Sequence, residues 1–190
     1  MFNHNRGLWG YTGAAPDGEP LTIQATGMGG PSAAIVLSEL IALGATRAIR
    51  VGTCGALVDD LALGDLVIAR EALCGDGTSR ALGAGERVSA DSKLSDALAR
   101  AAPAARAGTV MSVDLFYDTG ARAAGHGALA VEMEAAALFA LGSRSGVQVA
   151  CVLTVSDTFE ADGARRRIED KSLLASAAQM GIAAMAAMPS

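Results

Sequence analysis

The stretch VEMEAAALFALGSRSGVQVACVLTVSD (residues 131–157) decides the fold class of this chain. Residues 131–146 open as a turn and continue as a helix. Gly146 ends this helix, because glycine readily takes the left-handed conformation that follows many helices. Residues 147–157 form a long apolar run, which predicts a buried strand. A helix that leads into such a strand is typical of α/β proteins.

The rest of the chain continues this alternation. A strand that runs into a glycine loop is predicted at 21–30, further strands at 48–55, 65–73 and 107–113, and helices at 31–43, 92–102 and about 168–188. This rhythm predicts a mainly parallel sheet with helices on both faces. Residues 13–18 are predicted to form a hairpin loop. No linker or repeat divides the chain, so residues 1–190 are expected to form one domain.

The composition argues against several classes of protein. Apolar residues make up 51% of the 190 residues and charged residues 18%, which suits a folded core and not a disordered chain. The net charge is −5 and the one basic cluster is Arg165–Arg167, so no nucleic-acid partner is expected. No apolar stretch is long enough to cross a membrane, so no membrane partner is expected.

Three cysteines, Cys54, Cys74 and Cys151, are too few and too scattered for a disulfide framework or a zinc site. We therefore expect reduced thiols, a cytoplasmic location and no metal.

In open α/β sheets, ligands bind beyond the carboxyl ends of the strands. The loop GMGG (27–30) could cradle an anion there or serve only as a turn, and it matches neither a dinucleotide fingerprint nor a P-loop. In RVGTCG (50–55), Arg50 and Thr53 offer a guanidinium and a hydroxyl to a phosphate. The alternative, favoured when this motif is taken alone, is an arginine paired with a carboxylate at the sheet edge.

Three carboxylates lie near the ends of predicted strands. Glu132 and Glu134 flank Met133 at a strand-to-helix junction. A carboxylate there could accept hydrogen bonds from a ribose diol, although two glutamates that favour a helix N-terminus are the simpler interpretation. Asp157 ends the most apolar strand, where it could donate a proton or cap the next turn.

The order of the motifs is more specific than any one of them. NRGLWGYTG (5–13), TGMGGPSAAIVLSELIALGA (26–45), RVGTCGA (50–56), LGDLVIA (63–69), DLFY (114–117), VEMEAAALFAL (131–141) and TVSD (154–157) follow one another along the chain. In this order the chain resembles the purine nucleoside phosphorylases of the bacterial, oligomeric type, within the nucleoside phosphorylase superfamily. The resemblance implies a three-layer α/β/α fold around a central mixed, mainly parallel twisted sheet.

The resemblance also implies phosphorolysis of purine nucleosides to free base and ribose 1-phosphate, with inorganic phosphate as co-substrate, no cofactor and a homo-oligomer, a hexamer in the family. Asp157 would protonate N7 of the purine, assisted by one of Arg165, Arg166 and Arg167. The implied phosphate ligands are Arg50, Thr53 and Gly29, with Arg6 reaching the neighbouring subunit's site. The implied ribose contacts are Glu134, Met133 and Met28, and the implied base contacts are Phe116, Cys54, Gly55 and Glu132.

Two departures from the family pattern keep other functions open. The chain is expected to be N-terminally short, without the family's further glycine–arginine phosphate loop and sugar-binding histidine, since His4 lies in a different segment. The stretch 117–131 is also short. The alternatives are a phosphorylase of reduced activity, a hydrolytic nucleosidase, a pyrimidine phosphorylase and a non-catalytic nucleoside binder. Arg50 and Arg6 argue against hydrolysis, and Asp157 argues against a pyrimidine substrate.

Overall fold

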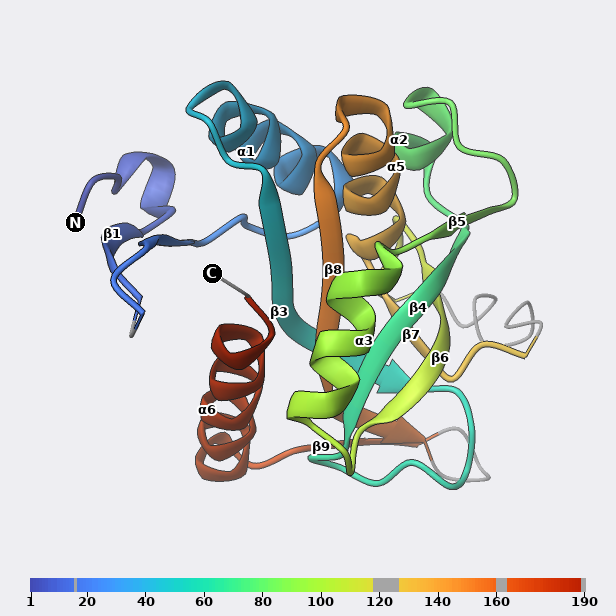
Figure 1. Ribbon diagram of the computed structural model, residues 1–190. Helices are drawn as coiled ribbons and strands as arrows, with labels where there is room; N and C mark the ends of the chain where they lie inside the picture. The colour runs from blue at the N-terminus through green and yellow to red at the C-terminus, as the bar shows by residue number, and fades with distance from the viewer. Residues whose placement is uncertain (16, 118–126, 160–163, 189–190) are drawn as a thin grey trace.

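A computed structural model describes residues 1–15, 17–117, 127–159 and 164–188, and it shows a curved central sheet between two groups of helices (Figure 1). Within these described residues the sheet contains seven strands, in the order β5-β4-β6-β7-β3-β8-β9. These strands are β3 (Arg47–Ala56), β4 (Leu66–Cys74), β5 (Arg87–Ser89), β6 (Arg106–Ser112), β7 (Ala130–Glu132), β8 (Gln148–Phe159) and β9 (Arg165–Arg167).

Parallel ladders hold the centre of this sheet. The two longest join β3 to β8 and β4 to β6, and antiparallel pairs add β5 and β9 at the margins. Strand β4 also pairs with β8, so β4, β6, β7, β3 and β8 form a closed ring. The predicted mixed, mainly parallel sheet is therefore confirmed, with a curvature that the helix–strand rhythm does not specify.

Helices cover the sheet on both sides (Figure 1). On one side lie α1 (Gly30–Ala42), α2 (Gly77–Ala81) and α5 (Ala135–Ser145), and on the other lie α3 (Ser92–Ala101) and α6 (Asp170–Ala187). Alternate residues of β4 separate the two cores: Val67 and Ala69 belong to one, and Ile68 belongs to the other. This arrangement is the expected three-layer fold. None of the described helices is both long enough and apolar enough to span a membrane.

The strand predicted at 21–30 is present as β2 (Pro20–Gln24), but its expected place in the central sheet is corrected by the structure. Strand β2 (Pro20–Gln24) pairs with β1 (Gly10–Ala14) in a separate antiparallel hairpin and takes no part in the central sheet. The hairpin loop predicted at 13–18 is confirmed, since the two strands flank residues 15–19. Both strands are largely exposed, so the alternation of β2 reflects a hairpin and not a strand of the core.

Candidate active site

A pocket of about 460 Å³ lies where β3, β7 and β8 end, a volume suited to a small ligand. Strands β3 and β8 run side by side to the same end of the sheet (Figure 1), and their register places Gly55 opposite Asp157. Gly55 also pairs with Val131 of β7, which brings in the segment with the two glutamates. Of the residues expected at the site, the pocket gathers Met28, Arg50, Thr53, Cys54, Gly55, Phe116, Glu132, Met133, Glu134 and Asp157.

Glu132 lines this pocket, but its carboxylate is turned into the protein. The side chain is 0% exposed and accepts hydrogen bonds from the Ser112 hydroxyl and from the backbone N–H groups of Glu134 and Ala135. The last two belong to the start of α5, where unpaired N–H groups and the helix dipole favour a carboxylate. Burial raises the pKa of Glu132, while the positive charge of Arg50 opposes this rise.

Arg50 contacts both glutamates. Its Nε lies 3.3 Å from Glu132 Oε2, and its Nη2 lies 2.5 Å from Glu134 Oε2. Burial alone would lower the pKa of Arg50, but the neighbouring carboxylates outweigh burial and raise it. Gly52 leaves room for this arrangement, because a Cβ there would lie 2.7 Å from the guanidinium. Arginine–carboxylate pairing, the alternative interpretation of RVGTCG, is thus what the structure shows.

Glu134 bridges groups from two distant segments. Its Oε1 accepts a hydrogen bond of 2.5 Å from the backbone N–H of Gly29, and its Oε2 accepts from Arg50. Gly29 precedes α1 with a φ of 85°, a conformation that favours glycine. Gly29 does not itself line the pocket. Glu134, which was expected to bind ribose, therefore contacts two groups that were expected to bind phosphate, Arg50 and the Gly29 N–H.

Asp157 is buried at the end of β8 and is held through both oxygens. Its Oδ1 accepts from Arg165 Nε at 2.6 Å, and its Oδ2 lies 2.7 Å from the Ser156 hydroxyl. Arg167 Nε lies farther away, at 3.7 Å. Residues alternate along β9, so Arg165 and Arg167 share the face toward Asp157 and Arg166 takes the other. Of these two arginine contacts to Asp157, that of Arg165 is the shorter.

The outer part of the pocket has an aromatic and apolar wall. The Arg165 guanidinium lies 4.5 Å from the centroid of the Phe116 ring, within the range of a cation–π contact. Tyr117 packs edge-on against Phe116, and Phe159, which carried no role in the sequence analysis, lines the same pocket. Met28 is 87% exposed at the rim. This wall offers a flat apolar surface to a planar ligand.

Two cysteines beside the site are not suited to nucleophilic attack. Burial raises the pKa of Cys54 and that of Cys151, so both thiols stay protonated at neutral pH. The Cys54 thiol lies 3.5 Å from the Thr154 carbonyl oxygen, to which it donates. Among the described residues, no cluster of histidine, cysteine and acidic side chains could hold a metal ion.

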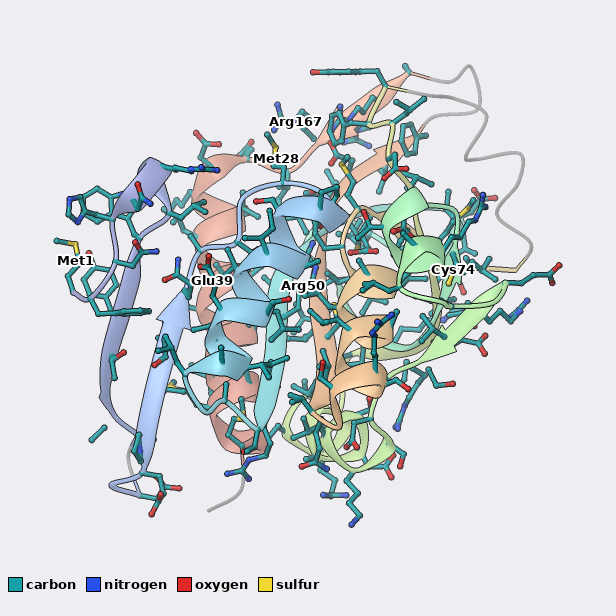
Figure 2. All side chains as sticks on the ribbon, turned by 90° about the horizontal axis from the view of Figure 1, so that it is seen from above. Met1, Met28, Glu39, Arg50, Cys74 and Arg167 are labelled. Carbon is teal, nitrogen blue, oxygen red and sulfur yellow. The ribbon has the colours of Figure 1, made fainter. Side chains whose placement is uncertain are left out.

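Arg6 lies apart from this pocket. It belongs to a short 3-10 helix, η1 (Asn5–Gly7), beside the N-terminal hairpin, and it is exposed. Figure 2 shows Met1 of the same segment far to one side of Arg50. Within one chain Arg6 therefore does not contribute to the pocket, which is compatible with the expected role at a neighbouring subunit.

Comparisons with known proteins agree with this geometry. The family model for the phosphorylase superfamily matches residues 1–188. A DeoD-type purine nucleoside phosphorylase from Clostridium novyi (strain NT) is 36% identical over 169 residues, which cover 83% of this chain and 72% of the relative. Another from Bacillus thuringiensis (strain Al Hakam) is 39% identical over 168 residues, covering 82% and 71%. This chain belongs to the phosphorylase superfamily.

Proposed function

We propose that this protein cleaves purine nucleosides with inorganic phosphate and releases the free base and ribose 1-phosphate. The observation that carries the proposal is the arrangement of three side chains in one pocket. Arg50 offers a positive charge on a side chain that is 13% exposed, Glu134 lies beside it, and Asp157 lies by the aromatic wall. The relatives named as purine nucleoside phosphorylases support the same assignment.

The proposed roles follow from how charge develops as the bond breaks. The sugar becomes positive and the base becomes negative. A phosphate held by Arg50, Thr53 and the Gly29 N–H stabilises the sugar cation. Glu134 accepts from the ribose hydroxyls, with Met28 and Met133 against the sugar. Glu132 positions Arg50 and α5, because its oxygens are already taken by protein donors.

Asp157 acts as the general acid toward N7 of the base, which lies against Phe116 beside Cys54 and Gly55. Arg165 Nε is a permanent donor on Oδ1, so the transferable proton resides on Oδ2. The Ser156 hydroxyl beside Oδ2 also lies 3.2 Å from the Cys54 carbonyl oxygen. It can therefore donate to the ionised carboxylate, or accept from the protonated one while donating to the carbonyl.

Base release from inosine or adenosine should depend on phosphate. Initial rates are measured by absorbance at zero and saturating phosphate, with sulfate at equal ionic strength as the control. A phosphate-dependent rate is expected, because Arg50 places an anion-binding group in the pocket. Equal rates with and without phosphate would instead show a hydrolytic nucleosidase, and binding without turnover would show a nucleoside-binding protein.

The protein should form at least a homodimer through its N-terminal hairpin. Tyr11 and Ile23 on this hairpin are 51% and 65% exposed, and each hairpin strand packs mainly on the other. Burying this apolar surface against another copy would also bring Arg6 near a second pocket. Ile23→Ser should weaken association in sedimentation velocity, whereas Leu174→Ser, at an exposed position on α6, should not. A wild-type protein that is monomeric at micromolar concentration would contradict this proposal and the role of Arg6.

A further inference from the structure

We propose that the Glu134 carboxylate is an internal anion on the groups that we assign to phosphate binding, Arg50 and the Gly29 N–H, and that phosphate must displace it before it can accept ribose hydroxyls. The inference rests on the proposed function. It assigns Glu134 two successive partners, the anion-binding groups first and the sugar second.

The contacts of Glu134 match those of an anion oxygen pair. Oε1 takes the backbone N–H of Gly29 at the start of α1, and Oε2 takes Nη2 of Arg50, each at 2.5 Å. The side chain is 7% exposed and that of Arg50 is 13% exposed, so water does little to screen this pair. A helix N-terminus together with a guanidinium is a favourable place for a phosphate. Glu134 fills that place with the chain's own carboxylate.

The neighbouring glutamate shows why Glu134 is the displaceable one. Glu132 also accepts from Arg50 Nε, but it is fixed in addition by Ser112 and by two backbone N–H groups at the start of α5. Glu134 occupies the N-cap position of the same helix but makes no side-chain hydrogen bond to it. Its side chain is therefore tied to the two anion-binding groups and not to its own helix. It can rotate away without uncapping α5.

Displacement couples the two substrates. Once phosphate takes Arg50 and the Gly29 N–H, both carboxylate oxygens of Glu134 are released next to Met28 and Met133, where the proposed function places the ribose. Phosphate should therefore tighten nucleoside binding. By thermodynamic reciprocity, nucleoside should tighten phosphate binding by the same factor. A site whose phosphate groups were vacant before binding would show no such coupling through Glu134.

Titration calorimetry with inorganic phosphate tests the displacement. Glu134→Gln keeps the shape but loses the charge that competes for Arg50, so phosphate affinity should rise about tenfold or more. Asp157→Asn is the matched control, because it removes a charge from the same pocket without touching Arg50, and its effect should stay below about threefold. Unchanged or weaker phosphate binding in folded Glu134→Gln would overturn the proposal.

A second measurement needs only the wild-type protein. A purine C-nucleoside, whose carbon–carbon glycosidic bond cannot be cleaved, should bind more tightly when phosphate is present. Its 2′,3′-dideoxy analogue, which has no hydroxyls for Glu134, should not. Equal effects of phosphate on both ligands would overturn the proposal while leaving phosphorolysis intact. A wild-type protein that binds no phosphate at all would overturn both this proposal and the proposed function.

Discussion

Asp157→Asn should lower kcat for adenosine by about 10²-fold or more, since asparagine keeps the shape of aspartate but has no proton to give to the leaving base. Adenine leaves poorly as an anion, so its departure depends strongly on protonation at N7. Inosine should lose less, because its 6-oxopurine anion is the better leaving group. The comparison uses kcat at saturating phosphate for both nucleosides.

A third substrate separates proton donation from positioning. The base of 7-methylguanosine already carries a positive charge and needs no proton, so its turnover should be nearly unchanged in Asp157→Asn. This nucleoside is therefore an internal control for folding and binding. If its turnover fell as far as that of adenosine in a folded variant, Asp157 would be a positioning residue and the general-acid role would be wrong.

Arg50→Met should lower the free energy of unfolding by about 3–5 kcal/mol, the effect typical of removing one partner from a buried ion pair. The loss arises because Glu132 is fully buried and would keep its charge without its counterion. Arg70→Met is the control, since Arg70 pairs with Asp96 at the exposed surface. There the loss should be about 0–1 kcal/mol. Both losses of unfolding free energy are to be measured from urea unfolding curves.

The deficit of Arg50→Met should depend on pH in a defined direction. Burial raises the pKa of Glu132 in the folded protein, and Arg50 opposes this, so the variant should show a larger rise. A carboxyl group whose folded pKa is raised adds stability at low pH and loses that contribution as pH rises through the folded pKa. The difference from wild type should therefore be smaller at pH 5 than at pH 8. A constant difference would show that Glu132 does not carry the effect.

Local patterns were sufficient for most of the core. Helix α5 and strand β8 follow from one continuous stretch, because a turn, an apolar helix and a long apolar run each leave a clear signal. Strand β2 was assigned to the wrong sheet for a physical reason. Its alternation specifies an extended segment, but the partner strand depends on contacts that a local pattern does not contain.

The sequence predicted which residues form the site better than it predicted the contacts between them. Motif order nominated Arg50, Glu134 and Asp157, and the structure brings them to one pocket. Pairing of Arg50 with a carboxylate was one interpretation of RVGTCG, but its partners Glu132 and Glu134 were not specified, because they lie 82 and 84 residues farther along the chain. The contact between Arg165 and Asp157 depends on the pairing of β9 with β8, which residue spacing does not reveal.

The fate of the phosphate distinguishes phosphorolysis from hydrolysis. Inosine is incubated with radiolabelled inorganic phosphate, and the products are separated by ion-exchange chromatography. Phosphorolysis should yield one labelled ribose 1-phosphate for each hypoxanthine released. Hypoxanthine accompanied by unlabelled free ribose would contradict it, because the pocket would then activate water and the anion-binding role assigned to Arg50 would be wrong.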